Sequence, residues 1–356
     1  MTIDVDIHYL RAWREVLQGC RLRTGELVTV LTGPTTDPRT RAAACLAARD
    51  LGGVLTVIDL PAAVTAARSL SPDPLAYVGA TPLAGNAVAV AALMQSHLVI
   101  DLMLLLFSKE QADILAAGAR MLLAIEPPEI LMRMIPTPAD RERVLQAAKL
   151  LQPAKRLEVI SPAGTRLTAS LGEYPVLTEY GLADAPGRWD HWPSGFVATW
   201  PDECSAEGEV VLAPGDAILP FKTYVQQSIR LRIERGYVRA IEGGVEAEFL
   251  RGYMDSFDDP EAYAVSHLGW GLQPRASWTT LGLYDRAQTI GMDARAFEGN
   301  FLFSLGPNTE AGGTRATPCH MDIPMRKCSV RLDGRPIVDE GVVVAPTLRR
   351  NAACAR

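Results

Sequence analysis

The chain has 356 residues, of which 48% are hydrophobic and 21% are charged, so it is long enough for two domains and apolar enough to form packed cores. Acidic residues outnumber basic ones by 41 to 35, and the resulting net charge of −6 does not favour nucleic-acid binding. The six cysteines form no C-x-x-C pair and are too sparse for a disulfide scaffold, which predicts reduced thiols and a cytoplasmic location.

No membrane association is expected from the hydrophobic segments. Charges at Asp4, Asp6 and Arg11 interrupt the apolar run that a signal peptide would need. The most apolar stretch, residues 87–107, is broken by four polar residues between 95 and 101 and leaves too short a run to cross a bilayer. It is interpreted as a buried element.

The first 160 residues alternate short apolar runs with helical patterns, which is typical of an α/β domain with a mostly parallel sheet. Asp37-Pro38 and Thr137-Pro138 are helix starts, because Asp or Thr can cap free N–H groups and Pro suits the first helical position. Strands are expected at residues 27–32, 54–58, 97–102 and 121–125, and helices at residues 10–17, 39–51 and 138–151.

After Pro153 the pattern changes to shorter β-like runs separated by Gly and Pro, which predicts an α+β domain with a largely antiparallel sheet. We therefore divide the chain into an α/β domain, residues 1–160, and an α+β domain, residues 161–356. The clearest expected elements of the second part are strands at 156–161, 209–212, 229–234 and 237–241 and a helix at 246–257.

Common catalytic signatures are absent from the sequence. The nearest approach to a phosphate-binding loop, Gly306 to Thr314, lacks the lysine and has the wrong spacing, so it is interpreted as a loop. The dinucleotide fingerprint G-x-G-x-x-G, the zinc-protease motif H-E-x-x-H and the nucleophile elbow G-x-S-x-G do not occur either.

The segment that carries chemistry is the H-x-D pair His320 and Asp322. Side chains two apart in an extended segment point the same way, so an imidazole and a carboxylate can reach one metal ion. A third ligand must come from the scarce histidines, and both His267, beside Gly269 and Gly271, and His191, in a Trp- and Pro-rich run, lie in site-like sequence. His8 and His97 are interpreted as structural.

Two His and one Asp are the ligands of many non-haem Fe(II) oxygenases, which keep open positions for substrate and O₂. The same set can hold catalytic zinc, so ligand type alone leaves an oxygenase and a hydrolase open.

Several runs together resemble the 2,5-dihydroxypyridine 5,6-dioxygenases, a family of nicotinate and nicotine degradation that opens the pyridine ring to N-formylmaleamate. The resemblance spans essentially the whole chain. The runs are Thr178 to Gly181, Pro186 to Gly195, Ser266 to Arg275, Met292 to Phe297, Gly299 to Asn308 and Pro318 to Pro324, with further matches at residues 37–40, 79–86 and 124–129. The family is similar in fold to thermophilic metallo-aminopeptidases, so the resemblance implies an aminopeptidase-T-like fold.

The resemblance implies Fe(II) as cofactor, held by His267, His320 and Asp322, and a small aromatic N-heterocycle and O₂ as reactants. It makes His191 the acid/base group, places Glu179 at the pyridine N–H or 2-hydroxyl, and lets Arg295 stabilise negative charge on dioxygen. The alternative for Arg295 is a surface ion pair with Asp293 or Glu298. Substrate-binding residues implied by the resemblance are Leu106, Phe107, Glu179, His191 and Ser304.

Phe107 stands where the family pattern has histidine, so a phenyl ring replaces a group that can exchange protons. This puts the identity of the substrate in question more than the reaction type. A metal-dependent aminopeptidase that uses Glu179 as base is the main alternative function, and a non-catalytic oligomeric binding protein is a second. The apolar N-terminal part and the family pattern predict a homo-oligomer.

Overall fold

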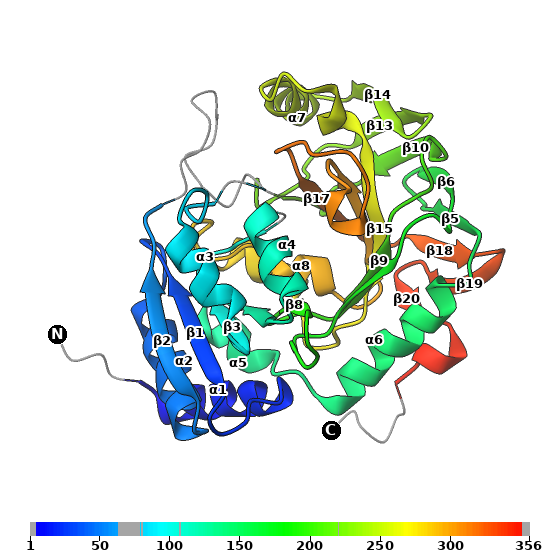
Figure 1. Cartoon of the computed structure of the whole chain (residues 1–356). Helices are drawn as coiled ribbons and strands as arrows, with labels where there is room; N and C mark the ends of the chain where they lie inside the picture. Colours follow the sequence, from blue (N-terminus) through cyan, green and yellow to red (C-terminus); the bar gives the residue numbers. More distant parts are fainter. Residues whose placement is uncertain (1–4, 63–78, 80, 107, 220, 351–356) are drawn as a thin grey trace.

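The computed structural model describes residues 5–62, 79, 81–106, 108–219 and 221–350, and the structural statements below refer to these residues. Two halves face each other, a three-layered α/β half and a half built on antiparallel sheets (Figure 1). The eight α-helices of the described residues are α1 (Ile7–Gly19), α2 (Pro38–Asp50), α3 (Ala87–Met94), α4 (Lys109–Ala116), α5 (Pro128–Arg133), α6 (Pro138–Leu151), α7 (Val245–Asp255) and α8 (Met292–Ala296).

Sheet A is parallel throughout and forms the centre of the first half. Its strands, in spatial order, are β2 (Val54–Asp59), β1 (Leu27–Thr32), β3 (Leu98–Asp101), β4 (Arg120–Leu123) and β8 (Trp189–His191). Alternate residues of the strands face opposite layers: Val28 and Val30 pack with α1 and α2, whereas Leu31 packs with α3 and α4. This is why the strands read as continuous apolar runs.

Two antiparallel sheets form the second half. Sheet B has the order β14 (Tyr237–Glu242), β13 (Ile229–Glu234), β10 (Glu207–Leu212), β6 (Arg166–Ser170), β5 (Arg156–Ile160), β18 (Ser329–Leu332), β19 (Arg335–Asp339) and β20 (Val342–Val343). Sheet C has the order β17 (Met321–Met325), β16 (Phe301–Leu305), β15 (Val265–Gly271), β9 (Phe196–Thr199) and β7 (Val176–Glu179), and a small ribbon joins β11 (Ala217–Ile218) to β12 (Thr223–Tyr224).

One face of sheet C belongs to the large hydrophobic core that also contains the inner face of sheet B. Phe301, Phe303 and Ile323 lie on this face, and Leu268 and Trp270 of β15 share it. Because side chains alternate along a strand, the intervening residues of β15 and β17 point to the opposite face of sheet C. That face turns toward the α/β half and carries the candidate site.

The predicted fold class is confirmed, and the expected strands and helices of both halves occur within a few residues of their predicted bounds. The division at residue 160 stays a prediction, and β8 crosses it: this strand lies in the second part of the chain but completes sheet A beside β4.

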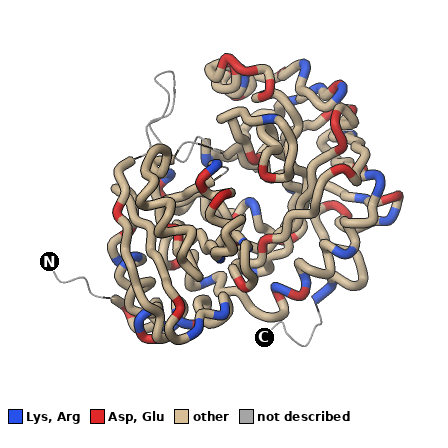
Figure 2. The backbone as a smooth tube through the Cα atoms, viewed as in Figure 1, with Lys and Arg blue, Asp and Glu red and all other residues tan. Residues whose placement is uncertain are grey.

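The apolar stretch at 87–107 is only partly buried, so its interpretation as a buried element is wrong for α3. Strand β3 is completely buried, whereas Val88 and Met94 of α3 are exposed. No helix among the described residues is both long and apolar enough to cross a membrane. Acidic and basic residues are interspersed along the chain rather than gathered into a basic stripe (Figure 2).

Candidate metal centre and catalytic cavity

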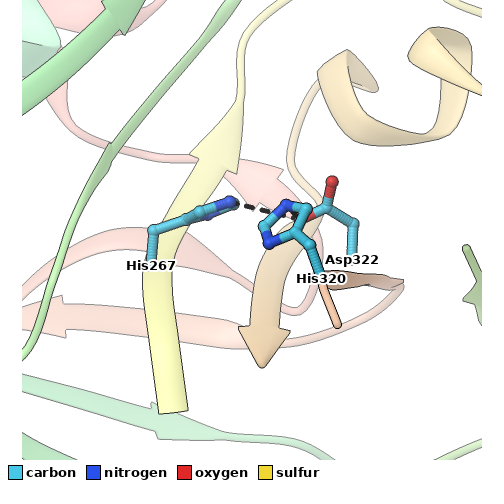
Figure 3. Close-up of side chains that lie close together, drawn as sticks. All are labelled: His267, His320 and Asp322. Atoms are coloured by element: carbon cyan, nitrogen blue, oxygen red, sulfur yellow. Dashed lines mark ion pairs between the residues drawn. The ribbon is translucent and has the colours of Figure 1, made fainter. Parts of the chain in front are cut away.

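Three donor side chains converge on the cavity-facing side of sheet C. His267 comes from β15, and His320 and Asp322 come from the start of β17, two strands away (Figure 3). Nε2 of His267 lies 3.3 Å and Nε2 of His320 lies 3.4 Å from Oδ1 of Asp322. The three side chains are at most 8% exposed. The structure thus brings together the three residues that the sequence predicts as metal ligands.

The donor set fits one transition-metal ion. One ligand atom from each residue can be chosen so that all three lie within 4.8 Å of one another. Donors bound at about 2.1 Å to one ion and at right angles to each other lie roughly 3 Å apart, close to the distances from each imidazole to Asp322. Nδ1 of His267 is buried and has no hydrogen-bond partner in the described part of the chain. Two imidazoles and a carboxylate suit Fe(II), and they also suit Zn²⁺.

Arg295, on α8, sets the charge of this site. Its Nε donates to Oδ2 of Asp322, so neither of the alternative partners named for it holds this guanidinium. Asp293 instead pairs with Arg133 at 2.7 Å, and Glu298 pairs with Arg143. Burial by itself would raise the pKa of Asp322, but Arg295 and the two imidazoles outweigh burial and hold that pKa well below its usual range. Asp322 is therefore an anionic ligand at neutral pH.

The two glycines of β15 allow close packing around His267. A Cβ on Gly269 would lie 2.1 Å from the backbone oxygen of Val197, and one on Gly271 would lie 2.2 Å from that of Phe297. The glycines therefore admit the neighbouring backbone, and Trp270, which lies between them, points into the core on the other face of β15.

A cavity opens in front of the three donors. Its described lining consists of Leu104, Leu106, Leu123, Leu177, Glu179, Trp189, His191, Phe196, Lys222, His267, Ile290, Met292, Arg295, Glu310, His320 and Asp322. The predicted residues Glu179, His191, Arg295 and Leu106 all belong to this lining. Ser304 does not: it is buried on β16, and its hydroxyl donates to the backbone oxygen of His267 at 2.9 Å.

Burial disfavours the charged forms of both His191 and Glu179. Burial, with a smaller effect of Arg295, lowers the pKa of His191 to about 3, and its Nε2 has no hydrogen-bond partner among the described residues. Burial and the nearby Asp190 raise the pKa of Glu179 well above its usual range, although Ser194 Oγ donates to its Oε2 at 3.0 Å. The cavity therefore offers a neutral imidazole and a carboxyl whose protonated form is favoured by its surroundings.

Asp190 ties together two of the runs that the sequence singled out. This buried carboxylate accepts N–H groups from Tyr180, Gly181 and His191 at 2.8 to 3.2 Å and pairs with Arg188. It thereby holds the chain after β7, which carries Glu179, against the end of β8, which carries His191. Both runs were recognised in the sequence, but the hydrogen bonds between them could not be predicted, because they depend on the position of β8 in sheet A.

The loop after β3 forms another part of the wall. Asp101 accepts the N–H groups of Met103 at 2.9 Å and Leu105 at 2.6 Å, and this turn holds Leu104 at a φ of 67°. Leu104 and Leu106 line the cavity. Phe107 lies outside the described residues, so its predicted contact with substrate stays a prediction.

Sequence reasoning missed two ionisable residues of the lining, Lys222 and Glu310. Lys222 follows β11, and its Nζ donates to the backbone oxygen of Arg286 at 2.5 Å. Glu310 lies in the run from Gly306 to Thr314, which the sequence marked only as a loop. The remaining histidines are not in the lining. Nδ1 of His97 accepts the N–H of Leu27 at 3.0 Å, in keeping with a structural role, whereas His8 is exposed on α1.

A buried two-His, one-Asp set on an antiparallel sheet, facing the carboxyl edge of a parallel sheet across a cavity, defines the class of metal-dependent enzymes. Comparison with known proteins identifies the family of the chain. A family model described as 2,5-dihydroxypyridine 5,6-dioxygenase matches residues 8–345. The 2,5-dihydroxypyridine 5,6-dioxygenase of Pseudomonas putida KT2440 is 54% identical over 334 residues, which cover 94% of this chain and 95% of that protein.

The solved structure of the dioxygenase from Pseudomonas putida KT2440 matches with a TM-score of 0.93 at 53% identity, covering 96% of this chain and 98% of that one. The chain therefore belongs to the 2,5-dihydroxypyridine 5,6-dioxygenase family, which confirms the resemblance seen in its sequence. Wild-type AmpT from Thermus thermophilus matches with a TM-score of 0.65 at 16% identity, covering 95% and 99% of the two chains. This second match concerns the fold alone and confirms the expected aminopeptidase-like architecture.

Proposed function

We propose that the protein is a non-haem Fe(II)-dependent dioxygenase that opens 2,5-dihydroxypyridine, or a close hydroxypyridine, between C5 and C6 to N-formylmaleamate. Both atoms of O₂ enter the product and the C5–C6 bond breaks. The observation that supports this most is the convergence of His267, His320 and Asp322 on a buried cavity in a chain 54% identical to a dioxygenase of that name.

The metal would be held by the two imidazoles and the carboxylate, and Fe(II) bound there supplies the one-electron chemistry that lets O₂ react with an electron-rich ring. The chain supplies the proton transfers and the polar contacts. Neutral His191 can accept the proton of a ring hydroxyl, because its Nε2 is unpartnered in the described structure and lies in the cavity wall. We assign it the acid/base role.

Glu179 and Arg295 act on charge and orientation. A neutral Glu179 can donate a hydrogen bond to the ring nitrogen or the 2-oxygen of the substrate. Arg295 keeps Asp322 anionic and, since it also lines the cavity, places a permanent positive charge beside the atoms on which negative charge develops. Leu106 and Phe107 are proposed to bound the ring, and Ser304 to act through the backbone of His267 as a positioning residue.

The test is anaerobic reconstitution with Fe(II), followed by measurement of O₂ uptake and product mass with 2,5-dihydroxypyridine. We expect one O₂ consumed per ring opened, and no turnover when Zn²⁺ replaces Fe(II). Peptide hydrolysis by the zinc-loaded protein without O₂ consumption would support the aminopeptidase alternative and defeat this proposal.

We further propose that the protein is a cytoplasmic homo-oligomer. The exposed apolar residues Val88 and Met94 on α3 and Phe249 on α7 are suited to contacts between subunits. Light scattering of the holoenzyme tests the oligomer, and a monomer at micromolar concentration would contradict it.

The cytoplasmic location is supported by the cysteines. The described residues Cys20, Cys45, Cys204, Cys319 and Cys328 are free thiols, which suits a reducing compartment.

A further inference from the structure

Glu310 lies where the metal cavity meets an outer groove. Four described residues line both spaces: Leu106, Leu177, Trp189 and Glu310. The first three present mainly apolar surface. Among the described residues that line both spaces, Glu310 therefore supplies the ionisable group. A ring bound in the cavity with its hydroxyl toward the metal donors would have its opposite edge near this mouth.

The loop that carries Glu310 is closed and anchored. The N–H of Asn308 donates to the backbone oxygen of Arg315 at 3.2 Å, and the N–H of Arg315 donates to Oδ1 of Asn308 at 2.9 Å. Both residues are also tied to Glu203, Asn308 through Nδ2 at 2.8 Å and Arg315 through its guanidinium at 2.7 Å. These bonds fix the neck of the loop.

The glycine after the tip of this loop is required by packing. A Cβ on Gly313 would lie 2.2 Å from the side chain of Asn308, so no larger residue fits while the neck is closed. The run from Gly306 to Thr314 therefore has a structural role. It holds the short 3₁₀ helix Thr309–Ala311, and with it Glu310, at the mouth of the cavity.

The chemistry of Glu310 suits the polar edge of a pyridone. Glu310 lines both the cavity and the groove while part of its side chain stays exposed to solvent. The protein atoms around this carboxyl and the nearby carboxyls of Glu179 and Asp322 raise its pKa, which favours the protonated form. A protonated carboxyl presents an O–H donor beside a C=O acceptor. A 2-hydroxypyridine in its pyridone form presents an N–H donor beside a C=O acceptor, which is the complementary pattern.

We propose that Glu310 is a specificity-determining residue that binds the ring N–H and the 2-oxygen of the hydroxypyridine through a pair of hydrogen bonds. The proposal rests on the proposed function for the choice of ligand. It adds a second carboxyl to the side of the substrate assigned to Glu179, whose Oε2 already accepts a hydrogen bond from Ser194. Glu310 thereby selects rings that carry the lactam edge over rings that carry only the metal-directed hydroxyl.

The test compares two ligands in the anaerobic Fe(II) enzyme: 2,5-dihydroxypyridine, which has the lactam edge, and 3-hydroxypyridine, which lacks the 2-oxygen. Glu310→Ala is expected to weaken binding of 2,5-dihydroxypyridine about tenfold to a hundredfold, the loss of two hydrogen bonds, and to leave 3-hydroxypyridine within about twofold. Glu310→Gln should restore most of the affinity, because a primary amide also places a donor beside an acceptor. Glu248→Ala, on the exposed side of α7, is the matched control and should change neither.

Equal weakening of both ligands by Glu310→Ala would overturn the proposal, since it would show a general effect on the mouth of the cavity. So would an unchanged affinity for 2,5-dihydroxypyridine, or a Glu310→Gln variant as weak as Glu310→Ala. A wild-type enzyme that binds 2,5-dihydroxypyridine but consumes no O₂ would defeat the proposed function and leave this binding comparison valid.

Discussion

The two walls of the cavity are built in different ways. On one side, His267 and Asp322 lie on strands of sheet C whose backbones are paired with neighbouring strands and whose other face is packed in the core. A second group of lining residues, Leu104, Leu106 and Glu310, lies on loops that are held by a few side-chain bonds from Asp101 and Asn308. The wall that carries the proposed metal donors (the strand wall) therefore depends on paired strands. The wall that carries the proposed substrate contacts (the loop wall) depends on individual polar residues, so we expect it to change without disturbing the donors.

The largest effect is expected on the strand wall when one donor is removed. His320→Ala should abolish iron retention and reduce turnover by roughly a thousandfold or more, because two remaining donors cannot hold the ion in a defined geometry. Metal analysis after desalting measures the loss. His8→Ala, which removes an exposed imidazole on α1, serves as control and should retain iron. Unchanged iron content in His320→Ala would show that the donor assignment is wrong.

The packing of the strand wall is tested at Gly271. Gly271→Ala should lower the free energy of unfolding of the metal-free protein by roughly 1–3 kcal/mol, since the new Cβ would meet backbone atoms of Ala296 and Phe297 that cannot rotate away. Urea unfolding provides the measurement. The matched control is Gly252→Ala on α7, where a Cβ meets nothing within 4 Å, and this variant should be as stable as wild type or slightly more stable. Equal stability of the two variants would argue against a rigid strand wall.

The loop wall is expected to respond to pH through Asp101. Burial raises the pKa of Asp101 to about 6, so the folded state binds its proton more tightly than the unfolded state does. The stability that this group contributes is fully present below about pH 4 and is lost as the pH rises through 6. Asp101→Asn removes this dependence and should also lower kcat/KM by loosening the turn at Leu104.

The stability deficit of Asp101→Asn relative to wild type should therefore be larger at pH 5 than at pH 7, by about 1 kcal/mol. Urea unfolding at the two pH values measures it, and Asp113→Asn on α4, where the carboxylate is partly exposed, is the control. A deficit that grows toward pH 7 would contradict the assigned direction of the pKa.

The smallest effect is expected at Phe107, which follows the cavity residue Leu106 in the sequence. Phe107→His should change the relative kcat/KM for different hydroxypyridines by up to about tenfold, because it exchanges an apolar ring for a group that donates or accepts hydrogen bonds. The iron content should remain that of wild type. A change in iron content without a change in substrate preference would show that this position acts on the strand wall instead.

The sequence was sufficient for much of the framework. Apolar runs such as Leu27–Thr32 and the capped helix at Pro138–Leu151 depend on local patterns, and the H-x-D spacing placed His320 and Asp322 together because alternation along a strand is a local property. No local pattern could identify the third donor, because β15 lies near β17 only through the strand order of sheet C. The family resemblance identified that donor as His267.

Other features depend on long-range contacts that no local pattern shows. The strand β8 has only three residues, and its place in sheet A decides where His191 points. Glu310 reaches the cavity because Asn308 and Arg315 close its loop, and Ser304 turns to the backbone of His267 rather than into the cavity. The exposure of the apolar residues on α3 could not be predicted from hydropathy either, because hydropathy measures how apolar a segment is and not which neighbours cover it.

The most direct test of the central claim is isotopic labelling of the product. The Fe(II) enzyme is given 2,5-dihydroxypyridine under ¹⁸O₂ in ordinary water, and the ring-opened product is analysed by mass spectrometry without delay. We expect both atoms of one O₂ molecule in the product, which is the outcome for a dioxygenase acting at this two-His, one-Asp site. A product whose new oxygen comes from water, formed without O₂ uptake, would contradict the account.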